Sequence, residues 1–172
     1  MSKEKLWTKE FILVSLINFL IMMVYFLLIV TIAPYAVEEF NASTSVAGLV
    51  SGIFILGSLI GRLITGRIIQ LRGSRKTILI GLIFFLITTA LYYAAINLTL
   101  LLIIRLLHGI AVGIASTAAG TIVAQIIPEN RRGEGIGYFS MTAIAGSAIG
   151  PFIGILLTRR KIGTCLIRKT TS

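Results

Sequence analysis

The sequence is poor in charge, and it contains no aspartate. Only 13% of its 172 residues are charged, and the six acidic residues are all glutamates. Because a soluble domain usually carries about 25% charged residues, this low charge and a mean hydropathy of +0.99 indicate an integral membrane protein. A single cysteine, Cys165, excludes an internal disulfide and a cysteine-based metal site.

Motifs of enzyme chemistry are also absent. The sequence has no nucleotide-binding loop, no metal-ligand cluster and no arrangement of serine, histidine and acid around a nucleophile. We therefore expect neither an enzyme nor a bound metal or cofactor. The net charge of +10 does not predict a nucleic-acid partner, because the basic residues cluster between apolar runs instead of covering a soluble surface.

Five apolar runs are each long enough to cross the hydrocarbon core of a bilayer, which is about 30 Å thick. They predict an all-α integral membrane bundle with transmembrane helices at about residues 11–32, 45–69, 77–96, 100–127 and 135–158. The first run is too long for a signal peptide, and no small-residue cleavage site ends it. A polar loop is expected from Pro34 to Asn41.

The distribution of lysine and arginine predicts the orientation. Residues 1–10, the turn at 71–76 and the loop at 128–134 are basic, whereas the loops at 33–44 and 97–99 contain no lysine or arginine. Basic loops of membrane proteins lie in the cytoplasm. We therefore expect a multi-pass protein of the inner cell membrane with a cytoplasmic N-terminus.

The basic tail at residues 159–172 does not fit this orientation. After five spans it should emerge on the outside, yet it carries five basic residues. It is also too short and too interrupted for a sixth span. One interpretation is that the tail inverts the last helix, and the favoured one is an ending created by truncation or a frameshift.

Glycines at a spacing of four residues predict close contacts between helices. Gly146, Gly150 and Gly154 fall on one helical face, and Pro151 in the same run is expected to bend or loosen the helix. The same spacing recurs in two earlier runs. The glycine pairs are Gly48 with Gly52, Gly57 with Gly61, and Gly109 with Gly113.

Polar residues inside the apolar runs are the candidate functional residues. Arg62 and Arg105 are costly in a bilayer and should face protein or water. Arg67 can instead extend to the interface. His108 shares a helical face with Arg105, and it would serve either in proton transfer or as a packed, hydrogen-bonded residue. Asn18 and Tyr25 share a face of the first run, where they would line a polar path or bond a neighbouring helix.

Three motifs, in their order and spacing, resemble the major facilitator superfamily (MFS), and in particular its drug:proton antiporter branch. The first resembles the family's cytoplasmic gating motif, although Gln70 stands where that family usually has aspartate. Arg105 with His108 resembles the fourth-span motif implicated in proton coupling. The fifth-span glycines with Pro151 resemble the antiporter motif associated with export. The gating motif comprises Gly66, Arg67, Gln70, Arg72, Gly73, Arg75 and Lys76.

The resemblance implies an MFS-like helical bundle over about residues 11–158 that corresponds to the N-terminal part of a transporter. It implies proton-coupled efflux of drugs or other amphipathic small molecules by alternating access, with the proton gradient as the energy source and Arg105, His108 and Arg62 as candidate coupling residues. A C-terminal half would be a missing partner. The alternatives are a non-transporting or partner-binding membrane subunit, and self-association of two copies around a pore.

Overall fold

The computed structural model describes residues 5–170, with the backbone alone for residues 159–170. Its described part consists of five long helices and two short 3-10 turns, and it contains no strand. Each long helix is apolar enough to cross a membrane, which confirms the predicted all-α membrane bundle. The elements are α1 (Lys9–Phe40), α2 (Thr44–Arg72), α3 (Ser74–Leu91), η1 (Tyr92–Ala94), α4 (Leu98–Ile126), η2 (Glu129–Arg131) and α5 (Arg132–Thr170).

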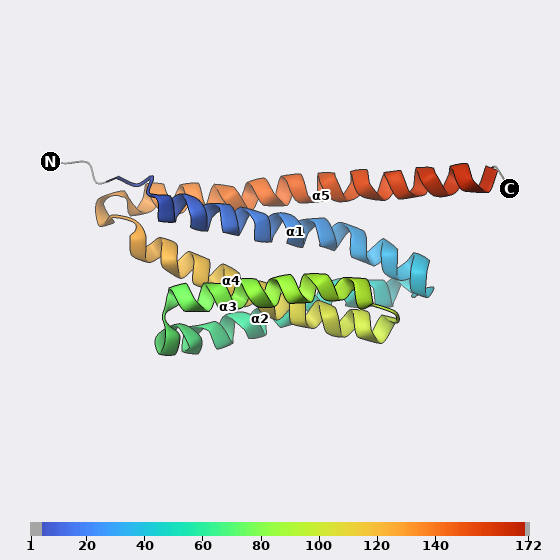
Figure 1. Cartoon of the computed structure of the whole chain (residues 1–172), viewed down its shortest axis with the longest axis horizontal. Helices are drawn as coiled ribbons and strands as arrows, with labels where there is room; N and C mark the ends of the chain where they lie inside the picture. Colours follow the sequence, from blue (N-terminus) through green and yellow to red (C-terminus); the bar gives the residue numbers. More distant parts are fainter. Residues whose placement is uncertain (1–4, 171–172) are drawn as a thin grey trace.

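The helices form two groups around a central helix (Figure 1). α5 runs beside α1 on one side, and α2, α3 and α4 pack together on the other. α4 also contacts α1 and thereby joins the groups. Its central place shows in its burial, because 56% of its most apolar 18 residues are buried, compared with 28% or less in every other helix.

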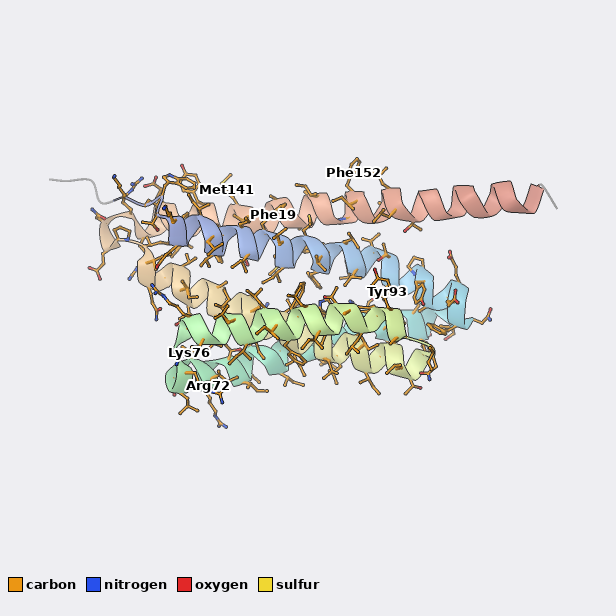
Figure 2. The ribbon with its side chains drawn as sticks, viewed as in Figure 1. Phe19, Arg72, Lys76, Tyr93, Met141 and Phe152 are labelled. Atoms are coloured by element: carbon orange, nitrogen blue, oxygen red, sulfur yellow. The ribbon has the colours of Figure 1, made fainter. Side chains whose placement is uncertain are left out.

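The outer faces of the bundle are apolar. Leu63 on α2 and Leu86 on α3 are 71% and 65% exposed. Figure 2 shows Met141 and Phe152 pointing outward from α5, where both are also exposed. Apolar surface of this extent requires lipid or further protein around it, in agreement with a membrane bundle.

The first helix is longer than the sequence indicated. The expected polar loop from Pro34 to Asn41 is wrong, because α1 continues through Pro34 and ends at Phe40. Ile32 and Ala36, on either side of the proline, are both buried in one cluster with residues of α2 and α4. This packing holds the helix together where the proline removes a backbone hydrogen bond, and a helix also keeps its remaining backbone groups bonded in a bilayer.

The fifth helix continues unbroken through Pro151 and past the expected end at residue 158 (Figure 1). The prediction that the basic tail is an ending created by truncation or a frameshift concerns residues 159–172, whose side chains lie outside the described residues. The other helix ends lie close to their predicted positions. Three of the helix starts have side-chain caps. The oxygens of Thr8, Ser43 and Asn97 accept backbone N–H groups at the starts of α1, α2 and α4.

Glycines do bring helices into close contact at most of the expected places. On α2, a Cβ atom at Gly57 would collide with the backbone of Leu106, and one at Gly109 of α4 would collide with the backbone of Phe54. Gly61 and Gly113 meet the facing backbone in the same way. The two helices therefore touch along their main chains.

The fifth-span glycines make the same kind of contact with α1. A Cβ atom at Gly150 would lie 2.5 Å from the carbonyl oxygen of Met23, and one at Gly146 would lie 2.9 Å from that of Phe19. The packing expected for Gly48 and Gly52 is absent from the described structure, because a Cβ atom there would have nothing within 4 Å.

Candidate functional site

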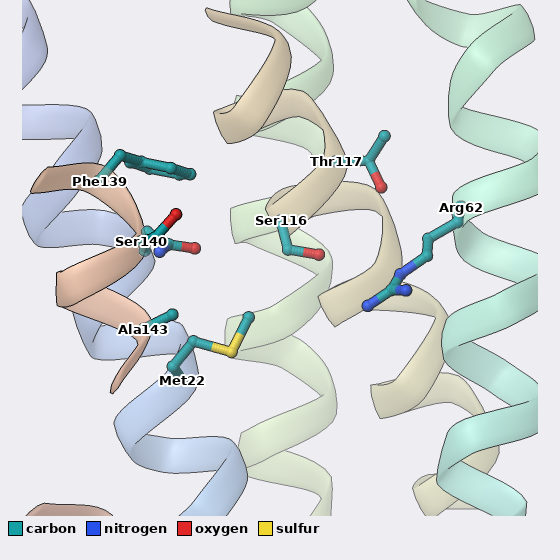
Figure 3. Close-up of a pocket in the computed structure, with 8 residues that line it drawn as sticks. Met22, Arg62, Ser116, Thr117, Phe139, Ser140 and Ala143 are labelled. Atoms are coloured by element: carbon teal, nitrogen blue, oxygen red, sulfur yellow. The ribbon is translucent and has the colours of Figure 1, made fainter. Parts of the chain in front are cut away.

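A polar cleft of about 410 Å³ opens between the two helix groups (Figure 3). Residues from α1, α2, α4 and α5 line it, so both groups contribute to its walls. Figure 3 shows the side chains of Arg62 and Met22 pointing toward one another from opposite sides. The lining residues are Asn18, Met22, Arg62, Ser116, Thr117, Phe139, Ser140 and Ala143.

The cleft lies about a third of the way along the bundle, inside the spanning helices. Asn18 is nine residues from the start of α1, Arg62 is ten from the end of α2, and Ser140 is eight from the start of α5. These three helix ends lie at the same end of the molecule (Figure 1). At 1.5 Å per residue the three side chains lie about 12–15 Å from that end, whereas α1 and α2 are each more than about 40 Å long.

The polar groups of the cleft differ in whether they already have hydrogen-bond partners within the protein. Asn18 donates its side-chain N–H to the hydroxyl of Thr142 at 3.0 Å and so joins α1 to α5. Arg62 is exposed, and it makes no hydrogen bond or ion pair within the described residues. Among the described residues it is the one charged residue that lines the cleft. The guanidinium of Arg62 is therefore available to a molecule that enters.

Arg105 lies in a different, fully buried place. Its Nε–H donates to the carbonyl oxygen of Val50 at 3.1 Å, and its Nη1 donates to the hydroxyl of Tyr92 at 3.4 Å. The guanidinium carbon lies 4.8 Å from the centre of the Phe54 ring, within the range of a cation–π interaction. Arg105 thus connects α4 to α2 and to the turn after α3, while its Nη2 has no hydrogen-bond partner in the described part of the chain.

His108 joins the same cluster through the hydroxyl of Tyr92, which lies 3.1 Å from Nδ1. Its Nε2 lies 3.5 Å from Thr89 Oγ1, whose own proton is donated to the carbonyl of Phe85. One assignment satisfies all these groups: Arg105 donates to Tyr92, Tyr92 to Nδ1, and Nε2–H to Thr89. The hydrogen bonds therefore run in one direction and hold His108 as the neutral Nε2–H tautomer.

The residues expected to carry transport chemistry therefore occupy two places. Asn18 and Arg62 line the cleft, whereas Arg105 and His108 lie together in the buried cluster. Tyr25 does not line the cleft, and its ring stacks at 4.7 Å on Phe54, the ring that also faces Arg105.

Sequence reasoning missed the hydroxyl groups of the cleft and the role of Tyr92. The adjacent polar pair Ser116 and Thr117, inside the apolar fourth span, was a visible signal for the cleft. Tyr92 had no such signal, because it lies at a helix end where tyrosine is common.

The gating motif forms the turn between α2 and α3. Gly73 has a φ of 77° there, in the left-handed region that glycine adopts without strain. Arg75 pairs with Glu10 of α1 at 2.8 Å on the exposed surface, and Ser74 donates to Gln125 of α4 at 3.2 Å. The turn is thus tied to both helix groups. The remaining motif residues, all exposed, are Gly66, Arg67, Gln70, Arg72 and Lys76.

The fold and the cleft define a multi-pass α-helical membrane protein with a polar cleft between two groups of spanning helices. The comparison with protein families gives the same result. The model of the Major Facilitator Superfamily matches residues 14–164. The chain belongs to this superfamily, and the superfamily resemblance expected from the three motifs is confirmed. A family of transporters also supports the expectation that the chain is not an enzyme.

Individual relatives agree with the family. An uncharacterised MFS-type transporter of Methanocaldococcus jannaschii is 31% identical over 73% of this chain and 32% of its own length. Multidrug resistance protein 3 of Bacillus subtilis is 32% identical over 63% of this chain and 21% of its own. The quinolone resistance protein NorA of Staphylococcus aureus is 25% identical over 74% and 33%. The chain thus spans about a third or less of the length of these relatives.

Proposed function

We propose that this bundle forms part of a proton-driven exporter of small amphipathic molecules that works by alternating access. The observation that carries the proposal is the polar cleft within the spans, built from both helix groups of an MFS bundle. The names of two relatives, a multidrug resistance protein and a quinolone resistance protein, support export of drug-like molecules.

The two helix groups supply the moving parts in this proposal. The glycine face of α5 contacts α1 closely, and Pro151 leaves one backbone carbonyl of α5 without its usual partner. A helix face without side chains of its own allows α5 to shift against α1. The gating turn, which ties α3 to α1 through the exposed Arg75–Glu10 pair, would open and close at one end.

Arg105 and His108 remain candidates for proton coupling. Their hydrogen-bond chain runs from the guanidinium through Tyr92 to the imidazole, so protonation of His108 would reverse the donor at Nδ1. Such a change at the junction of α2, α3 and α4 would alter how these helices hold together. Replacement of Arg105 by alanine is expected to abolish proton-linked flux in an active transporter, and unchanged flux would remove Arg105 from the coupling mechanism.

The test is reconstitution of an active transporter that contains this chain into proteoliposomes with an imposed proton gradient and a trapped pH-sensitive dye. The expected result is that amphipathic substrates move only while the gradient lasts, and that their movement consumes it. The controls are empty liposomes and the variant Ser140→Phe, which fills the cleft. Absence of flux would contradict proton-driven export and favour the alternative of a non-transporting, partner-binding membrane subunit.

A further inference from the structure

The cleft carries a positive charge that no acidic residue of the described structure balances. Among the described residues Arg62 is its one charged lining residue, and the chain has no aspartate. The glutamates of the described residues lie near helix ends, and none of them lines the cleft. They are Glu10 at the start of α1, Glu38 and Glu39 at its end, and Glu129 and Glu134 around the start of α5.

Arg105 shows how this fold surrounds the guanidinium of a buried arginine with contacts. A backbone carbonyl, a tyrosine hydroxyl and an aromatic ring surround that guanidinium. Arg62 has none of these contacts in the described structure, although it is also placed within a span, where an arginine is costly. A charged group that lies within a span and faces a cleft is a candidate functional site, and its partner would come from the molecule that binds there.

We propose that the substrate of this transporter carries an acidic group that pairs with Arg62. This inference rests on the proposed function and narrows it, from amphipathic molecules in general to amphipathic anions such as carboxylates, sulfonates and phosphate esters. A guanidinium binds such groups through two parallel hydrogen bonds. A cationic substrate would instead meet repulsion from Arg62 with no acid in the cleft to offset it.

The rest of the cleft suits the other parts of such a molecule. Ser116, Thr117 and Ser140 supply hydroxyls that donate to the remaining acceptor oxygens. Met22 and Phe139 supply polarizable and aromatic surface for an apolar body. The side chains of Arg62 and Met22 face each other across the cleft (Figure 3). An amphipathic molecule would therefore place its acidic group at Arg62 and its apolar body against Met22.

Two dyes with the same ring skeleton provide the test. Anilinonaphthalene sulfonate carries a sulfonate that phenyl naphthylamine lacks, and both become fluorescent in apolar sites. The full chain in nanodiscs of zwitterionic lipid is titrated with each dye. We expect saturable binding of both, with the sulfonate bound more tightly. Arg62→Gln is expected to weaken binding of the sulfonate about tenfold or more, while the uncharged dye binds as before and shows that the variant is folded.

Two further variants complete the design. Arg132→Gln removes one exposed positive charge at the start of α5, outside the cleft, and should leave both affinities unchanged. Arg62→Lys keeps the charge and should retain part of the preference. Equal weakening of both dyes by Arg62→Gln, or no weakening, would overturn the acidic preference alone. Absence of saturable binding of either dye would contradict the cleft as a substrate site and with it the proposed function.

Discussion

Two arginines within the spans have opposite surroundings, and we expect these surroundings to separate a charge that holds helices together from one that can meet a bound molecule. Arg105 is fully buried and bonded to other helices, whereas Arg62 is exposed in the cleft without a partner in the described structure. Sequence position alone does not distinguish them, because each stands in a long apolar run without an acid one helical turn away. The difference arises from partners contributed by other helices, Val50 from α2 and Tyr92 from η1.

The contrast predicts different effects on stability. Arg105→Gln should lower the free energy of unfolding by about 2–3 kcal/mol, because it removes a charged donor and leaves Val50 O and the Tyr92 hydroxyl without it. The same change at Arg62 should alter it by less than about 0.5 kcal/mol. Denaturant titration in mixed micelles, followed by circular dichroism, measures both. Equal effects of the two substitutions would show that Arg105 does not hold the helices together.

At the scale of the elements, the close contact between α2 and α4 depends on glycine, because glycine has no Cβ atom. Gly57 and Gly109 each face the backbone of the other helix so closely that no Cβ atom fits. Van der Waals contact between main chains is a principal source of helix association in a bilayer, where the hydrophobic effect is absent. Gly52 on the same helix faces open space and serves as a natural comparison.

A matched pair of alanine substitutions tests this contact. Intrinsic helix propensity favours alanine over glycine by about 1 kcal/mol at either position. Gly57→Ala should nevertheless destabilise the bundle by about 1–3 kcal/mol, because the new methyl group forces α2 away from Leu106 of α4. Gly52→Ala should leave stability unchanged or raise it slightly. The same denaturant titration applies, and stabilisation by Gly57→Ala would show that the helices are not in main-chain contact.

Much of the element structure could be predicted from the sequence, because hydropathy and glycine spacing are local properties. The five helices and the glycine contacts of α2, α4 and α5 follow from them. The continuation of α1 through Pro34 could not be predicted, since it depends on burial of Ile32 and Ala36 against distant helices. Glycine spacing also cannot tell which face has a neighbour, and the expectation for Gly48 and Gly52 was wrong for that reason.

The candidate site was predictable in part. An arginine in an apolar run is conspicuous, so Arg62 stood out at once. Hydroxyl residues such as Thr117 do not stand out, because serine and threonine in apolar helices commonly bond to their own backbone, as Thr31 and Thr65 do here. Only the assembled helices show which hydroxyls meet Arg62 in one cleft.

At the scale of the whole molecule, charge is divided between the two ends of the bundle. Figure 2 shows Arg72 and Lys76 at the end where α1 begins, and Tyr93 at the opposite end. Arg131 of η2 and Arg132, the first residue of α5, also lie where α4 passes to α5, at the first of these ends. By contrast, the short connection after α1 is preceded by Glu38 and Glu39 and contains no basic residue.

This asymmetry predicts that the basic end faces the cytoplasm when the protein lies in the inner membrane of a bacterial cell. In a background of Cys165→Ser, cysteines are introduced at Ser45, in the first turn of α2, and at Asn130, in η2, where both side chains are exposed. A membrane-impermeant maleimide applied to intact cells should label Ser45→Cys, whereas Asn130→Cys should react only after the cells are permeabilised. Labelling of Asn130→Cys in intact cells, with protection of Ser45→Cys, would reverse the orientation. The gating turn would then face outward, and the proposed direction of export would have to be abandoned.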